Sequence, residues 1–120
     1  MKDILLTAAG AIAALTALIH GYLTQKFLVA RLDTPDQATV PMLRRLSAML
    51  LQYSTFSWFI GGVALIVAAR MGIETRRLII LLVGAQYLFA IAGNAWASHG
   101  THVGWMVYSL VLVLMILAWR

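Results

Sequence analysis

Three long stretches without Lys, Arg, Asp or Glu constrain this 120-residue chain more than any other feature. An α-helix rises about 1.5 Å per residue, so roughly 20 apolar residues cross a hydrocarbon core of about 30 Å. The first two stretches, 4–25 and 46–69, are each long enough for one crossing, and the third, 78–119, is long enough for two. The sequence therefore predicts an all-α fold, an integral membrane four-helix antiparallel bundle. The crossings are expected at about 4–25, 46–69, 78–98 and 102–119.

The composition agrees with a membrane environment. Hydrophobic residues make up 62% of the chain and charged residues 11%, against roughly 45–50% and about 25% in soluble domains. A soluble domain of this size has too little interior to bury so much apolar surface. We therefore expect a single domain over residues 1–120 with the lipid bilayer as its first partner. The net charge of +5 lies between the apolar stretches, where it suits lipid headgroups, so no nucleic-acid partner is expected.

The cations divide almost evenly between the two ends of the predicted bundle. Five lie on the side of the termini and four lie on the opposite side, which gives a small preference for both termini in the cytoplasm. The first group is Lys2, Arg70, Arg76, Arg77 and Arg120, and the second is Lys26, Arg31, Arg44 and Arg45.

Small residues recur at every fourth position of the first predicted helix. Small side chains let helix backbones approach closely in lipid, where packing drives association. We therefore expect this stripe to form the helix-packing face. Its members are Ala9, Ala13, Ala17 and Gly21.

Polar side chains gather at one face of the predicted bundle, where four antiparallel crossings bring two pairs of helix ends together. Polar groups at membrane depth cost free energy unless they are paired, and they usually face the bundle interior or a wet cavity. These residues can be hydrogen-bonding contacts that only hold helices together, or they can form a ligand site. The sequence leaves both interpretations open. The candidates are His20, Ser54, Ser57, Asn94, His99 and His102.

The three histidines allow several chemistries. Neutral imidazole suits Zn, Cu or Fe, so His20, His99 and His102 could together bind a transition metal. His20 with His99 or His102 could instead ligate a haem. His20 alone could titrate as a proton relay or transport gate. Among cofactors, a bound metal or haem and no cofactor at all remain open.

Catalysis is not expected. The chain has no cysteine, so it lacks thiolate chemistry. Its four acidic residues lie outside the predicted crossings, which leaves no membrane-embedded pair of carboxylates. They are Asp3, Asp33, Asp36 and Glu74.

Four short segments form a pattern along the chain: Leu18-Ile19-His20-Gly21-Tyr22, Arg44-Arg45, Gly93-Asn94-Ala95-Trp96-Ala97 and Gly104-Trp105. This pattern resembles a family of small, uncharacterised four-helix bacterial membrane proteins. The resemblance implies the four-helix architecture, the inner membrane of a bacterium and a pairing of His20 with the end of the third helix, but no function.

Two better understood four-helix families share less of the pattern. Small multidrug transporters need a membrane-embedded Glu in their first helix, and no acid lies between Ile4 and Gln25. Dual-topology fluoride channels carry a box in their third helix that is similar to Tyr53-Ser54-Thr55-Phe56-Ser57, which here falls in the second. Neither resemblance extends to function.

Three functional hypotheses follow. The chain is expected to be a non-catalytic subunit or accessory protein that packs in a homo-oligomer or with other membrane subunits. One alternative is a small oligomeric transporter or channel with His20 as its titrating group. The other is a metal or haem carrier that uses His20 with His99 or His102.

Overall fold

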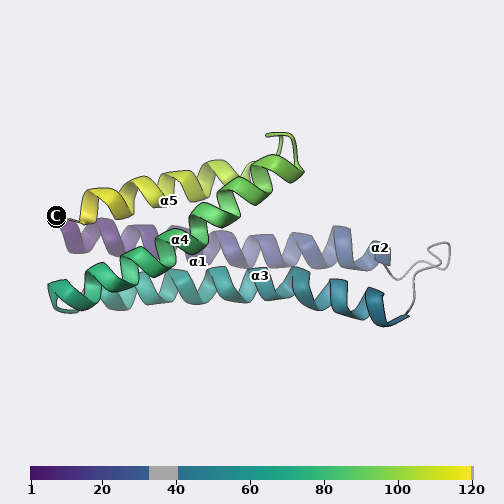
Figure 1. Cartoon of the computed structure of the whole chain (residues 1–120), viewed down its shortest axis with the longest axis horizontal. Coiled ribbons are helices and arrows are strands. Elements are labelled where there is room, and N and C mark those ends of the chain that lie inside the picture. Colours follow the sequence, from purple (N-terminus) through teal and green to yellow (C-terminus); the bar gives the residue numbers. More distant parts are fainter. Residues whose placement is uncertain (33–40, 120) are drawn as a thin grey trace.

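The computed structural model describes residues 1–32 and 41–119, and every regular element in that part of the chain is helical (Figure 1). The all-α prediction is therefore confirmed. The acidic residues Asp33 and Asp36 lie outside the described residues. The elements are α1 (Lys2–Leu23), the π-helical η1 (Thr24–Val29), the short α2 (Ala30–Leu32), α3 (Pro41–Ala68), α4 (Ile73–Ala97) and α5 (Gly104–Ala118).

In the described part of the chain, four rods form a closed ring of neighbours: the first is made of α1, η1 and α2, and the others are α3, α4 and α5. The chain reverses direction from each rod to the next. The first rod, made of α1, η1 and α2 end to end, packs against α3 on one side and α5 on the other. Helix α4 completes the ring by contacting both α3 and α5. Figure 1 shows α4 crossing the bundle obliquely, from beside the end of α3 up to the start of α5.

The contact between α1 and α3 depends on glycines. A Cβ atom on Gly10 would collide with the carbonyl oxygen of Gly62, and one on Gly62 would lie 2.7 Å from the backbone nitrogen of Ala14. Gly21 similarly leaves room for the side chain of Thr55 on α3. The backbones therefore approach closely, as expected where packing rather than water expulsion holds helices together. The expected stripe on α1 is buried at all four positions, Ala9, Ala13, Ala17 and Gly21.

Three helical segments are long and apolar enough to cross a membrane: Lys2–Val29, Pro41–Ala68 and Ile73–Ala97. The segment expected as the fourth crossing, 102–119, instead forms the 15-residue α5. At about 1.5 Å per residue this helix is about 22 Å long, shorter than a hydrocarbon core of about 30 Å. It starts late because the residues before Gly104 form a turn.

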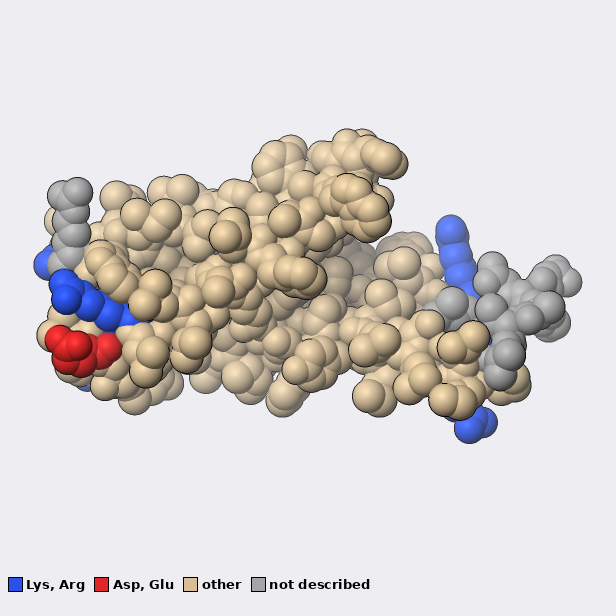
Figure 2. All heavy atoms as spheres, in the orientation of Figure 1, with Lys and Arg blue, Asp and Glu red and all other residues tan. Residues whose placement is uncertain are grey.

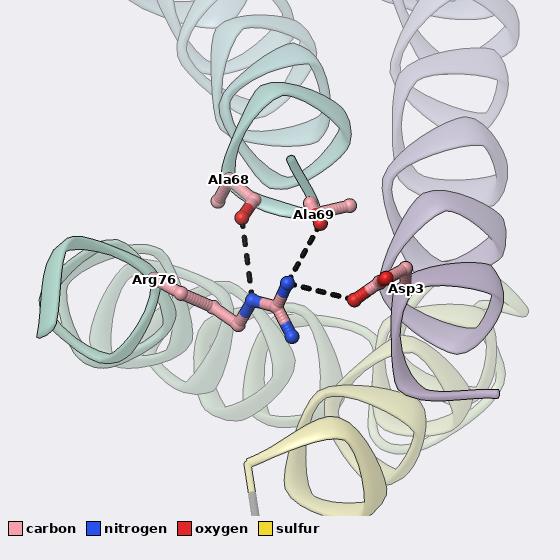
Figure 3. A network of polar contacts seen from close by, with 4 residues as sticks. All are labelled: Asp3, Ala68, Ala69 and Arg76. Carbon is pink, nitrogen blue, oxygen red and sulfur yellow. Dashed lines mark hydrogen bonds and ion pairs between the residues drawn. The ribbon is translucent and has the colours of Figure 1, made fainter. Parts of the chain in front are cut away.

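Charged side chains occupy the two ends of the long axis. Figure 2 shows cations at both ends of the visible face, acidic groups at one end, and a long uncharged middle. At the end with acidic groups, the Arg76 guanidinium joins three helices (Figure 3). Its Nη2 lies 2.7 Å from Oδ1 of Asp3 and donates to the carbonyl oxygen of Ala69, also at 2.7 Å. One arginine on α4 therefore holds the start of α1 beside the end of α3.

The opposite end of the bundle is stepped. Figure 1 shows the pair formed by α3 and the α1–η1–α2 rod extending beyond the turn that joins α4 to α5. No residue of α3 from 41 to 60 is fully buried, whereas Gly61, Gly62, Leu65 and Ala68 are. The last part of this stretch still contacts α4, through Ser57 and Trp58. We call the part of α3 over 41–60 the uncovered half of α3.

Candidate functional site

A cavity of about 590 Å³ lies where α5 begins, beside the junction of α1 and η1. We call it the His20 cavity. Its size falls within the range of about 300–1,000 Å³ typical of small-molecule sites. Its polar lining residues are Thr16, His20, Thr24, Asn94, Thr101 and His102, and the others are Ile19, Leu23, Phe27, Leu28, Trp58, Val103, Gly104, Val107 and Tyr108.

His20 is partly buried in the wall of this cavity, between the helix it belongs to and two aromatic neighbours. Its Nε2 lies 3.3 Å from Oγ1 of Thr24, one helical turn further along, and they share a hydrogen bond. Its ring centroid lies 4.7 Å from that of Trp58 and 6.3 Å from that of His102. The imidazole is therefore held by the hydroxyl of Thr24 on η1 and by the Trp58 ring from α3.

The π-helical segment η1 begins four residues after His20, at Thr24, and forms one side of the cavity. In a π-helix the backbone hydrogen bond spans five residues, as in the bond from the N–H of Ala30 to the carbonyl of Gln25. Short π-helical segments are often found at functional sites. Here Thr24, Phe27 and Leu28 from this segment line the cavity.

His102 approaches the cavity from the turn before α5. Its Nδ1 accepts a hydrogen bond of 3.0 Å from the backbone N–H of Gly104. A Cβ atom on Gly104 would lie 2.8 Å from that Nδ1, so glycine is needed for the ring to lie against the start of α5. Because Nδ1 accepts, the neutral ring carries its proton on Nε2 and presents an N–H donor there.

The serines belong to a second cavity, of about 410 Å³, between α3 and α4. Ser54, Ser57 and Asn94 line it, and of these only Asn94 also lines the His20 cavity. Their hydrogen bonds are mostly local: Ser54 donates to the carbonyl of Leu51, and the Asn94 amide donates to that of Ala90. Ser57 accepts from the side-chain amide of Gln86 on α4, which is a contact between helices.

His99 lines neither the His20 cavity nor the cavity between α3 and α4. It is exposed and has a positive φ of 49°. The turn therefore brings His102, and not His99, towards His20. Within residues 1–32 and 41–119, no group of three His, Asp or Glu side chains lies close enough to hold a metal ion.

Sequence reasoning missed the aromatic residues at the centre of the bundle. Tyr87 and Tyr108 are fully buried, with their ring centroids 4.8 Å apart, and the Tyr108 ring lies 5.1 Å from that of Trp58. The signal that could have found them is a spacing of three, seven and ten residues on one helix face. On α4 this spacing gives Ile80, Val83, Tyr87 and Ala90, and on α5 it gives Tyr108, Val111, Met115 and Ala118, all of which are buried.

No protein-family model, no curated protein and no solved structure matches this chain. The functional argument therefore depends on the chain's own geometry, which combines an all-helical fold, three helices long and apolar enough to cross a membrane, and an uncharged cavity lined by two histidines.

Proposed function

We propose that the chain is an integral membrane protein and acts as a non-catalytic subunit that packs against another copy of itself. The observation that carries this proposal is the uncovered half of α3, which has no buried residue from 41 to 60. Several of its large apolar side chains are exposed, including Met49, Phe56 and Tyr53 at 62–63%. From Leu46 onward this surface carries no charge, so the partner we expect is an equally apolar membrane helix.

The short fourth helix supports the same proposal. Its turn lies at the depth of His20, because the rings of His20 and His102 are 6.3 Å apart. His20 precedes Lys26, the next cation along the first rod, by roughly 9 Å of helix. Non-helical backbone below the membrane surface is tolerated where protein or water covers it. A second copy packed at the stepped end would provide that cover.

The carrier and transporter hypotheses have less support. A carrier that holds a metal or haem iron with two histidines needs one free ring nitrogen from each of them to point at the same metal atom. Metal-bound histidine usually donates its second ring N–H to an acceptor, whereas Nδ1 of His102 accepts a bond from Gly104. A transporter with His20 as its gate needs a path through the bundle, and the row of Trp58, Tyr108 and Tyr87 fills the centre next to His20.

The mass of the protein in nanodiscs tests self-association directly. We expect a mass of two or more chains, and a photo-reactive benzophenone attached to Met49→Cys in native membranes should cross-link to a second copy. Leu82→Cys on α4 is the matched control, because Leu82 is 65% exposed and Met49 63%. A single-chain mass together with no Met49-specific cross-link would contradict the proposal. A cross-link from Met49 to a different polypeptide would show that the partner is that polypeptide and not a second copy of this chain.

A further inference from the structure

The His20 cavity faces the apolar surface of the molecule. Several side chains that line it are also exposed, with 61% of Ile19, 50% of Phe27 and 65% of Val103 accessible. Ile19 and Val103 lie in uncharged stretches, whereas Phe27 lies beside Lys26, whose Nζ is 5.4 Å from the centroid of the Phe27 ring. In a membrane protein, such an opening gives access from the part of the hydrocarbon phase next to the headgroup layer.

The polar atoms of the cavity are neutral and few. No Lys, Arg, Asp or Glu is among the lining residues, so a charged ligand would lose its hydration without a compensating charge. His102 presents its Nε2–H as a donor, because Nδ1 is engaged by Gly104. The Asn94 side chain uses its amide nitrogen on Ala90, which leaves its carbonyl oxygen able to accept.

We propose that the His20 cavity binds a neutral amphiphile, an apolar molecule with a hydroxyl group at one end, taken up from the membrane. The hydroxyl oxygen accepts a hydrogen bond from Nε2–H of His102. The apolar body lies against Trp58, Phe27 and Val107, which give the cavity an aromatic and aliphatic wall. The lining residues come from a single chain, so forming the site requires no residue of a second copy, while uptake from the bilayer rests on the proposed membrane placement.

Tryptophan fluorescence can follow binding, because Trp58 lies in the cavity wall and bromine quenches indole emission. The probe is a brominated undecyl alcohol added to the protein in nanodiscs. We expect quenching with a saturable component above the linear background from probe dissolved in the bilayer. Trp58→Phe should remove most of the saturable component. A purely linear response in the unchanged protein would overturn the proposal.

Filling the cavity should abolish the saturable component. Val107→Phe adds bulk from α5, and Ile19→Phe adds bulk from α1, so a folding failure in one variant leaves the other informative. Met106→Phe is the matched control, since Met106 is on the same helix but does not line the cavity. Saturable quenching that survives in both folded filling variants would place the ligand elsewhere and overturn the assignment.

The hydroxyl contact is tested by His102→Phe, which keeps an aromatic ring and loses the donor. We expect affinity for the alcohol to fall about three- to tenfold, as for one lost hydrogen bond, while His99→Phe leaves it unchanged. Brominated undecane, which lacks the hydroxyl, should bind weakly and equally to all three proteins. Equal binding of both probes to the unchanged protein would point to a lipid acyl chain and contradict the assignment. The mass measured on the same samples reports self-association separately.

Discussion

Two adjacent glycines on α3 serve different neighbours, and this pair shows how single residues set the packing. Gly62 faces α1, where a Cβ atom would lie 2.7 Å from backbone atoms of Gly10 and Ala14. Gly61 faces α4, where a Cβ atom would lie 2.8 Å from the hydroxyl oxygen of Tyr87. That hydroxyl also donates a hydrogen bond of 2.9 Å to the carbonyl of Trp58. Neither glycine can be enlarged without a shift, but only at Gly61 is the closest obstacle a side-chain atom that can be removed.

We therefore predict that Gly61→Ala and Tyr87→Phe are coupled. Gly61→Ala should cost about 1–3 kcal/mol of unfolding free energy through overpacking. Tyr87→Phe alone should cost about 0.5–1.5 kcal/mol, the value of its hydrogen bond. Together they should cost less than the sum, by about 1 kcal/mol, because the missing hydroxyl relieves the closest contact. Denaturant unfolding in detergent micelles measures all three variants.

Gly62→Ala is the matched control for this pair. Its obstacles are backbone atoms of α1, so Tyr87→Phe should not relieve them and the two costs should add. Strict additivity at Gly61 as well would show that Tyr87 does not set the space at that position.

At the scale of the helix, the end of α3 depends on an arginine from the next element. The last carbonyls of a helix have no partner within it, and Arg76 supplies donors to those of Ala68 and Ala69 (Figure 3). The Arg76 side chain is only 13% exposed, whereas that of Asp3 is 66% exposed. The bonds to the carbonyls should therefore contribute more to stability than the ion pair does.

We predict that Arg76→Ala lowers the unfolding free energy by about 1–3 kcal/mol, because it leaves the nearly buried carbonyl of Ala69 without this donor, while that of Ala68 keeps the N–H of Met71. Asp3→Asn should change it by at most about 1 kcal/mol, as for an exposed ion pair, and added salt should reduce that effect further. Arg70→Ala, at an exposed position of the same end, is the control and should be within about 0.5 kcal/mol of the unchanged protein. Equal losses for Asp3→Asn and Arg76→Ala would mean that the ion pair, rather than the helix end, is what Arg76 stabilises.

The helices themselves could be predicted from the sequence, and the ends that shape the cavity could not. Uncharged stretches in lipid must satisfy their own backbone hydrogen bonds, which leaves the helix as their structure. The fourth crossing was expected from about residue 102, but α5 begins at Gly104, and the hydroxyl of Thr101 donates back to the carbonyl of Ser98. Instead, the first N–H of α5, that of Gly104, donates a hydrogen bond to Nδ1 of His102. This local competition between side chain and backbone has no periodic signal.

The candidate site shows the same division. Antiparallel crossings predict that His20, Asn94 and His102 lie at the same end of the bundle. In the structure these three residues line one cavity. The exclusion of His99 depends on its positive φ of 49° in the turn, which the spacing of three from His102 cannot reveal. The predicted bundle interior consisted of small and polar residues, so it did not include Tyr87 and Tyr108. In the structure these two rings fill the space between the small side chains.

For the whole molecule, the arrangement of charges makes the placement across a membrane testable. Figure 2 shows cations at both ends of the long axis, so each end suits a headgroup layer and the uncharged middle suits hydrocarbon. Both ends of the first rod carry cations, Lys2 at one end and Arg31 at the other. With five cations against four, the charge difference that orients the bundle is small.

Single cysteines at Met42 and Thr75, both exposed, should therefore lie on opposite sides of the membrane. We expect an impermeant thiol reagent to label Met42 from one side and Thr75 from the other. Leu82→Cys, in the middle of α4, is the control and should resist labelling. If the near balance of cations permits both orientations, Arg44→Gln with Arg45→Gln, which leaves two cations against five, should bring Thr75 to the cytoplasmic side in nearly all molecules. Labelling of Met42 and Thr75 from the same side in every molecule would contradict a crossing by α3.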